Sequence, residues 1–502
     1  MSAAVEPVAP VPRERVRARR FARGTTRDGM IAAVIALATL LASTALESPF
    51  RRMFETGGEF FVAVARTHLD RGLAFTKGQD WVRNSENPYD WRGADPDEAR
   101  PYAHHPPGLG LSLAALFLVL GDSPPIARLA TLAMHLAGVL LLVLTVRRFA
   151  EPRLPWAAFF TGVFAAAAPV SAFFGRHVCH EAWVVPPLLL AIAAYLPRIE
   201  RDDGGTRRED AAICIGIAVA TYYDWPGLYL PPLLFGLEIL RGRLRGRLAV
   251  WLVATSLVVG GLLVAQILWA TGSAGLASLA DGASKRVSLG TYGLAIGAWA
   301  AKVGEFFRDD FTGAVLILTI ATILAGSVLL FVRWLHASPA LSNVSGAGEP
   351  MRPSGAPAVR TLDPMTVWIG LWLGLGIFHV IAFPSGSFVH PYWLFYLLPA
   401  VATAAGLATS WLWRRRAFVR CAAGRTLALF ALFSFACESR ATLNRWYDVA
   451  RFSTGNPALD LPLPPRLESA CKACIPAWRW PPLFGTEPET AQVDVLARHR
   501  HA

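Results

Sequence analysis

Long apolar blocks alternate with short polar segments along most of the chain. The clearest blocks are residues 30–46, 126–146, 250–270, 313–332 and 365–383. A helix of about 20 apolar residues spans the hydrocarbon core of a bilayer, where a charged side chain is costly. The pattern therefore predicts an all-α polytopic membrane protein with about eleven transmembrane helices, within a range of about ten to thirteen.

Arginine and lysine residues gather in one set of the polar segments. These basic segments are residues 13–27, 147–153, 241–247 and 414–425. Short cytoplasmic loops of membrane proteins carry such an excess of positive charge. We therefore expect the N-terminus to lie in the cytoplasm, with every second connection on the same side.

This alternation divides the chain into three parts. We expect a basic cytoplasmic N-terminus over residues 1–28, a transmembrane domain over residues 29–436, and a short extracytoplasmic tail over residues 437–502. Within the domain, residues 48–124 form a long first extracytoplasmic loop that carries short interfacial helices.

Two segments of this loop are candidates for the interfacial helices. Residues 59–69 place Phe60, Val64 and Leu69 near one helical face, which is typical of a helix lying along the membrane surface. Residues 109–120 are apolar but short for a span. Counting them as a span would also move the arginines of residues 147–153 outside, against the charge rule, so we predict a re-entrant or interfacial helix.

Composition supports the membrane assignment and argues against a nucleic-acid partner. Only 17% of the 502 residues are charged and 54% are hydrophobic, whereas an average soluble domain has about 25% charged residues. The net charge of +12 comes from basic residues between apolar blocks. We expect the bilayer to be the partner of these residues, in the inner membrane of a bacterium.

Two of the six cysteines lie close together in the expected tail. Cys471 and Cys474 are separated by two residues. An extracytoplasmic tail permits a disulfide between them. A zinc site is the weaker alternative, because no second close pair of Cys or His residues completes the four ligands.

Polar residues of unusual kinds collect at the outer ends of the predicted spans. They are Glu55, Glu59, His104, His105, Arg176, His177, His180, Glu181, Asp224, His390, Tyr392 and Trp393. Ionisable residues at the membrane boundary are candidates for function. Carboxylates, histidines and an arginine on one side indicate acid–base chemistry on an anionic substrate.

Each of these residues also has an ordinary structural explanation. The two loop glutamates are then solvated acids, and the His104-His105-Pro106-Pro107 run is a stiff turn. Asp224 before Trp225-Pro226 is a turn residue, and the aromatic residues belong to an interfacial belt. Residues 176–181 are then an ion-pair network. Their common side of the membrane favours the functional explanation.

Five short motifs at these positions resemble one known family. They are Glu55-Thr56-Gly57-Gly58-Glu59 before an Ala65-Arg66 helix, Tyr102-Ala103-His104-His105-Pro106-Pro107, Phe174-Gly175-Arg176-His177 continuing to His180-Glu181, Tyr223-Asp224-Trp225-Pro226, and His390-Pro391-Tyr392-Trp393. In order and spacing they resemble the membrane glycosyltransferases of the C-type fold. That group includes the protein O-mannosyltransferases and the lipid A aminoarabinose transferases. The resemblance covers roughly residues 28–410.

The resemblance implies transfer of a sugar from a polyprenyl-phosphate donor to an extracytoplasmic acceptor, which is a protein, a lipid or a glycan. A loop carboxylate would act as the base, with inversion at the anomeric carbon. The family commonly has Asp, often Asp-Glu, where this chain has Glu55 or Glu59. Spacing from Arg66 favours Glu59, whereas relatives with an acid-polar-Gly run favour Glu55, which we prefer.

The resemblance also implies partners for the lipid phosphate of the donor. Arg176, His105 and His390 are the first candidates, with Lys285 or Arg286 from a later loop. No metal is required by the sequence. A divalent ion such as Mg²⁺ or Mn²⁺, bound by Glu55, His180 and Glu181, stays open as an alternative.

Two other functions predict different patterns. A transporter or flippase would carry charges near the middle of the bilayer and paired broken helices. An O-antigen-type ligase would carry its largest external loop late in the chain. Here the charges lie at the outer ends of spans and the long loop comes first, so a transferase is favoured.

Overall fold

The computed structural model describes residues 13–43, 46, 52–82, 100–243, 246–289, 295–336, 362–414 and 418–452. Helices dominate these residues, which confirms the all-α prediction. A two-residue antiparallel pair, β1 (Trp81–Val82) with β2 (Arg100–Pro101), is the one sheet within them.

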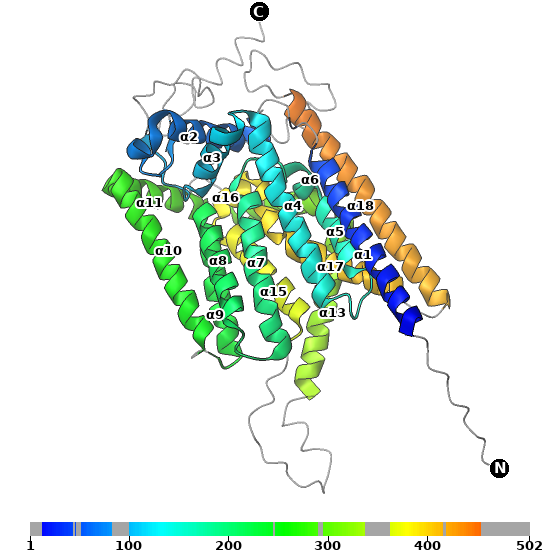
Figure 1. Cartoon of the computed structure of the whole chain (residues 1–502). Coiled ribbons are helices and arrows are strands. Elements are labelled where there is room, and N and C mark those ends of the chain that lie inside the picture. The colour runs from blue at the N-terminus through cyan, green and yellow to red at the C-terminus, as the bar shows by residue number, and fades with distance from the viewer. Residues whose placement is uncertain are drawn as a thin grey trace, which may run out of the picture.

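The helices follow the predicted blocks (Figure 1). In chain order they are α1 (Arg13–Ala42), α2 (Arg52–Thr76), α3 (Gly108–Leu120), α4 (Pro124–Phe149), α5 (Ala157–Ala167), α6 (Pro169–Phe174), α7 (His180–Arg201), α8 (Arg207–Tyr223), η2 (Trp225–Tyr229), α9 (Leu230–Leu240), α10 (Arg247–Thr271), α11 (Ser273–Val287), α12 (Ile296–Phe311), α13 (Gly313–His336), α15 (Pro364–Ala382), α16 (Pro384–Val389), η4 (Pro391–Leu397), α17 (Leu398–Arg414) and α18 (Phe418–Phe452).

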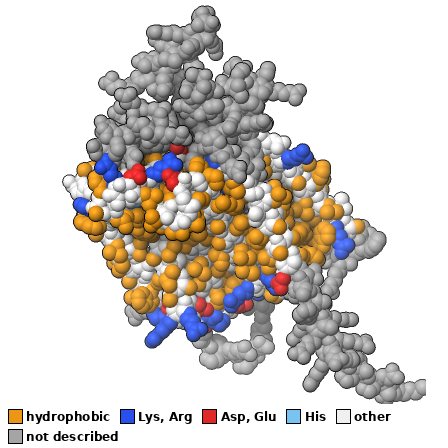
Figure 2. Space-filling view, turned by 45° about the horizontal axis from the view of Figure 1, so that its top comes forward, with side chains coloured by type: hydrophobic (Ala, Val, Ile, Leu, Met, Phe, Trp, Pro, Cys, Tyr) orange, Lys and Arg blue, Asp and Glu red, His pale blue; other side chains and the backbone are white. Residues whose placement is uncertain are grey.

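The described helices confirm a polytopic membrane protein but not a count of eleven spans. Six are long and apolar enough to cross a bilayer, and the pair α12–α13, bent by 100°, makes a seventh if it counts as one span. Each of the five clearest apolar blocks lies largely within one described helix (α1, α4, α10, α13 or α15), whereas α8 and α9 have only 17 and 11 residues. Figure 2 shows a broad zone of apolar side chains between two rims that carry the charges.

The predicted cytoplasmic and extracytoplasmic loops lie at opposite ends of the bundle. Arg147 at the end of α4 pairs with Asp28 in α1, and Arg153 pairs with Asp363 before α15. Arg414 at the end of α17 contacts the backbone of Arg153. This end is at the bottom of Figure 1, and we call it the lower end. That it faces the cytoplasm stays a prediction of the charge pattern.

The first loop forms a cap at the upper end. There α2 and α3 lie together, with α11 and α16 at the same level (Figure 1). α2 is longer than the predicted 59–69 helix and is interrupted at Gly72, whose φ of 73° is unfavourable for other residues. α3 packs on α2 through Leu109, Leu113 and Phe117, which are buried.

The last helix extends beyond the expected start of the tail. α18 continues to Phe452, because its polar half is held by the α12–α13 bend. Glu438 accepts a hydrogen bond of 2.6 Å from the Gly313 backbone N–H, and Arg445 pairs with Asp309 at 2.7 Å. Cys471 and Cys474 lie outside the described residues.

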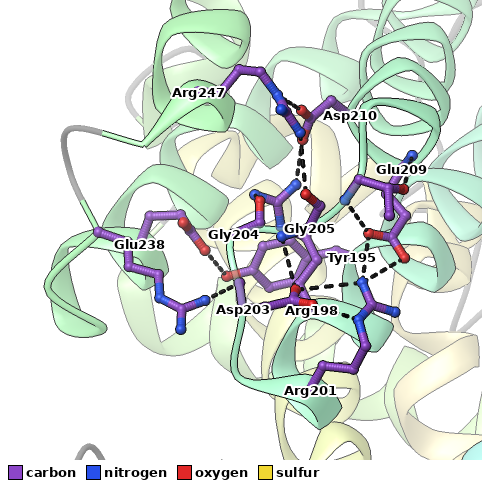
Figure 3. A network of polar contacts seen from close by, with 12 residues as sticks. Tyr195, Arg198, Arg201, Asp203, Gly204, Gly205, Glu209, Asp210, Glu238 and Arg247 are labelled. Carbon is purple, nitrogen blue, oxygen red and sulfur yellow. Dashed lines mark hydrogen bonds and ion pairs between the residues drawn. The ribbon is translucent and has the colours of Figure 1, made fainter.

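A network of ion pairs fastens α7 to α10 at the lower end (Figure 3). Buried Arg198 and partly exposed Arg247 both bind Asp210, and Arg241 donates to Glu238 at 2.8 Å. Arg201 binds Glu209 at 2.8 Å. The network pairs five arginines with five acids, namely Arg198, Arg201, Arg241, Arg243 and Arg247 with Asp202, Asp203, Glu209, Asp210 and Glu238.

Two arginines of this network give a matched test of its role. The Arg198 side chain is 1% exposed and that of Arg201 is 39% exposed. Arg198→Met removes the buried one of the two arginines that bind Asp210 and leaves the partly exposed Arg247, so we expect a loss in stability of up to about 3–5 kcal/mol. Arg201→Met should cost at most about 1 kcal/mol, because water screens its ion pairs. Thermal midpoints of the detergent-purified variants measure both, and equal midpoints would contradict the expectation.

Candidate active site

The turn between α6 and α7, which the sequence predicts to be external, places four of the predicted residues side by side. α6 begins at Pro169, and Gly175 follows its last residue because a side chain there would collide with His135. Arg176 and His177 then form the turn, and both are buried. His180 and Glu181, also buried, occupy the first turn of α7, where an acid is favoured by the helix dipole.

His105 is the hub of the polar contacts at the upper end. Its Nδ1 lies 2.8 Å from Asp224 Oδ1, and its Nε2 lies 3.2 Å from Arg286 Nη2. Asp224 is held in turn as the cap of η2, where its Oδ1 accepts the backbone N–H of Trp225 at 2.9 Å. Three segments far apart in the sequence therefore meet at one imidazole.

These contacts fix the protonation of His105. An arginine side chain only donates hydrogen bonds, so His105 Nε2 must accept from Arg286. The proton therefore sits on Nδ1 and is donated to the Asp224 carboxylate. Burial, Arg286 and His104 together hold the pKa of His105 well below its usual value. His105 is thus a neutral imidazole between an anion and a cation.

His104 and His177 are also held neutral. Burial, followed by the charge of Arg286, lowers the pKa of His104 to about 4. Burial, followed by Arg176 and Arg128, lowers the pKa of His177 to about 3. The histidines therefore leave the arginines as the permanent positive charges of this region.

His180 and Glu181 present polar atoms to the same hub. The ring of His180 stacks on His105 with centroids 4.4 Å apart, and neither of its nitrogens makes a hydrogen bond of good geometry to a described residue. The Oε2 atom of Glu181 is also buried without such a bond within the described part of the chain. Buried polar atoms of this kind are available to a ligand.

A further group of predicted residues, His390, Tyr392 and Trp393, lies next to His177. The Tyr392 hydroxyl lies 2.8 Å from His390 Nδ1, and its ring is 5.9 Å from that of His177. Trp393 is buried against His379, at 4.4 Å between ring centroids. Of the three, Trp393 packs into the bundle.

The two candidate bases lie on α2. Glu59 is half-buried, and the side chain of Glu55 lies outside the described residues. Gly57 between them is next to the turn between α6 and α7, since a Cβ placed on it would be 3.8 Å from His177 Nε2. The backbone that carries the two acids therefore adjoins the turn, and the role of either acid stays a prediction.

Two residues of this region have a larger place in the site than the sequence indicated. The sequence offers Lys285 or Arg286 as a phosphate partner, and the structure brings Arg286 to His105. Lys285 is exposed and pairs with Asp281 at 2.7 Å. The Tyr102 ring stacks on His105 with centroids 6.0 Å apart. The position of Tyr102 two residues before His104 is the sequence feature that could have indicated its place beside the histidines.

One substitution tests the neutral state of His177. Its pKa is about 3 in the fold and 6.5 ordinarily, so the unfolded chain binds more protons below about pH 6.5 and stability falls as pH falls. His177→Gln removes this group. Between pH 7.5 and 4.5 we expect the wild type to lose about 2–3 kcal/mol relative to the variant, visible as a shift between their thermal midpoints. A constant difference between the two would contradict this.

Comparison with known proteins gives matches among solved structures. No protein-family model and no curated protein matches the chain. An oligosaccharyltransferase of Archaeoglobus fulgidus, in complex with zinc and sulfate, matches with a TM-score of 0.52 and 16% identity, over 92% of this chain and 58% of its own. ArnT of Cupriavidus metallidurans, bound to undecaprenyl phosphate, matches with a TM-score of 0.48 and 17% identity, over 84% of this chain and 79% of its own.

The oligosaccharyltransferase AglB of Archaeoglobus fulgidus, in complex with an inhibitory peptide and a dolichol-phosphate, matches with a TM-score of 0.45 and 14% identity, over 93% of this chain and 61% of its own. The chain therefore spans about 60% of the length of these oligosaccharyltransferases. The fold is that of the C-type membrane glycosyltransferases. This confirms the resemblance at the level of the fold.

Within this C-type fold, several of the motifs that carried the resemblance meet at one end. The hub joins the first loop through His105, the second through His180 and the third through Asp224. No group of three or more His, Cys, Asp or Glu side chains in the described residues is arranged to hold a metal ion.

Proposed function

We propose that the chain is a membrane glycosyltransferase that transfers a sugar from a polyprenyl-phosphate donor to an extracytoplasmic acceptor. The observation that supports it is the hub at one end of an apolar bundle, in which buried Asp224 and His180 meet half-buried His105 and Arg286. We expect such a site to be reached by a prenyl chain from the bilayer and by an acceptor from the aqueous side.

Arg286 is the proposed receptor for the donor phosphate. A guanidinium binds phosphate oxygens through two parallel hydrogen bonds, which are stronger than a bond to a neutral nitrogen. In the structure its partner is neutral His105 at 3.2 Å. A phosphate is a better partner, and Tyr102, which also lies within reach of Arg286, adds a hydroxyl.

The transfer step requires a base on the acceptor side. A sugar or serine hydroxyl has a pKa far above neutral, so a carboxylate must take its proton as the new bond forms. We assign this role to Glu55 or Glu59. The acceptor oxygen attacks the anomeric carbon, the bond from that carbon to the phosphate oxygen breaks, and polyprenyl phosphate leaves with inversion.

A divalent cation is an optional part of this proposal. His180 and Glu181 have buried atoms that lack hydrogen bonds within the described residues, which suits a ligand role. Glu55 was the third expected ligand. A bound Mg²⁺ or Mn²⁺ would neutralise charge on the phosphate. The oligosaccharyltransferase noted above holds zinc and sulfate.

The direct test is a transfer assay on the purified protein. A panel of polyprenyl-phosphate sugars is offered with peptide, lipid and glycan acceptors, with and without chelator. We expect release of polyprenyl phosphate with at least one donor. Transport of the intact donor across vesicles, with no cleavage of its sugar, would support the flippase alternative instead.

A further inference from the structure

A buried polar triad lies within the first loop, apart from the predicted site residues. His68 of α2 stands between two side chains, with Nδ1 3.0 Å from Thr76 Oγ1 and Nε2 3.1 Å from Asp80 Oδ1. The side chains of His68 and Asp80 are 2% and 0% exposed. The triad satisfies most of its polar atoms internally, but Asp80 Oδ2 is buried without a hydrogen bond to a described residue.

The hydrogen bonds of the triad place its protons. The Thr76 hydroxyl donates to the Gly72 carbonyl at 3.3 Å, so its oxygen must accept from His68 Nδ1–H. One further proton then lies between His68 Nε2 and Asp80 Oδ1. Burial raises the pKa of Asp80, although His68 opposes the rise. The two side chains are joined by one shared proton.

The backbone of Asp80 and the side chain of Gln79 connect the triad to Tyr102, which precedes the two histidines His104 and His105. The Asp80 carbonyl accepts the Tyr102 backbone N–H at 2.8 Å, and Gln79 Nε2 donates to the Tyr102 carbonyl at 2.7 Å. The next residues pair as β1 and β2. Both the N–H and the carbonyl of Tyr102 are therefore held by hydrogen bonds, three residues before His105.

The α3 helix packs directly against the triad at Gly110. A Cβ placed on Gly110 would lie 2.5 Å from Asp80 Oδ1 and 2.7 Å from Val64 Cγ1. Glycine is required there because α3 packs directly on the carboxylate. Asp80 has no free space in which to turn, so its position is set jointly by α2 and α3.

We propose that His68 and Asp80 are positioning residues that hold the Tyr102–His105 segment in register with Arg286, and so shape the donor-phosphate site. This inference rests on the proposed function. The pair does not touch the hub itself. It acts through Tyr102, whose ring lies against both His104 and His105 at centroid distances of 5.0 and 6.0 Å.

Hydrogen exchange tests the positioning role without any assumption about activity. In Asp80→Ala we expect exchange of the amides of residues 102–105 to accelerate about tenfold or more, since the anchoring bond loses about 1.4 kcal/mol or more of support. Asp80→Asn still bonds to His68, so its exchange should stay within about threefold of wild type. Should Asp80→Ala fail to fold, Gln79→Ala removes one bond to Tyr102 and leaves the triad intact.

Binding of farnesyl phosphate tests the connection to function. We expect Asp80→Ala to weaken its Kd about tenfold, and the same change in a His105→Ala background to have no further effect. Arg66→Gln is the control, because Arg66 ties α2 to Asp122 at 2.6 Å and makes no contact with Tyr102. Its effect should be small and independent of His105.

The outcomes separate the two proposals. Unchanged exchange at residues 102–105 in a folded Asp80→Ala variant would overturn the positioning role, whatever the result for Gln79→Ala. Faster exchange combined with effects on Kd that add to those of His105→Ala would overturn its link to the phosphate site. A wild type that binds no farnesyl phosphate would overturn the proposed function, whereas the exchange result would still decide the positioning role.

Discussion

Glu55→Gln is expected to slow sugar transfer by about 10²–10⁴-fold, the usual contribution of a general base. Glutamine keeps the size of the side chain but does not accept the proton of the acceptor hydroxyl. The donor Kd should stay nearly unchanged, because the base acts on the acceptor. Single-turnover transfer and donor binding, measured on the same preparation, give the two quantities.

Glu59→Gln is the comparison for this measurement. It stands four residues along the same helix, is half-buried, and was the alternative base. A large loss in Glu59→Gln with none in Glu55→Gln would exchange their roles. Full transfer activity in both variants would remove the loop carboxylate from the mechanism.

Arg286→Gln is expected to weaken donor binding by about 10–100-fold. A charge-assisted hydrogen bond contributes about 1.5–3 kcal/mol, and each 1.4 kcal/mol is a factor of ten. The loss should be similar for donors with different sugars, because the phosphate is common to all. Equilibrium binding of undecaprenyl phosphate to the purified protein measures it.

Lys285→Gln is a closely matched control. It removes one positive charge from the adjacent position of α11, but Lys285 is exposed and pairs with Asp281. We expect less than about a twofold change at physiological salt, where exposed charges are screened. Equal losses of donor affinity in the two variants would mean that the overall positive charge of α11 determines binding and that the Arg286–His105 contact does not.

The spans and the side on which the histidines gather were accessible from the sequence, because both depend on local pattern. Apolar length predicts helices, and alternation assigns each connection to an end. The eleven-span count is not confirmed, since α9 is only 11 residues long and α12–α13 bends by 100°. Length and polarity do not encode how far a short helix penetrates when neighbours shield it.

Contacts between distant segments were not accessible in the same way. His105 and Arg286 are 181 residues apart and His105 and Asp224 are 119 apart, and no spacing rule links such positions. His68 and Asp80 are close in sequence, but they look like ordinary polar residues of a loop. Their exposed fractions of 2% and 0%, together with the packing of α3 at Gly110 on Asp80, show that both are interior groups.

The ion pairs that fasten α7 to α10 also bear on how the chain enters the membrane. Arg201 and Arg243 acquire their acidic partners from the α7–α8 connection and from α8, so full pairing requires several helices to be in place. Arg243 pairs with Asp202, 41 residues earlier in the chain, so we expect its charge to stay unpaired on the predicted cytoplasmic side until α8 and α9 have packed. Once the hairpins assemble, the same guanidinium groups become internal cross-links, so neutralising their acidic partners should leave orientation intact while loosening the finished bundle.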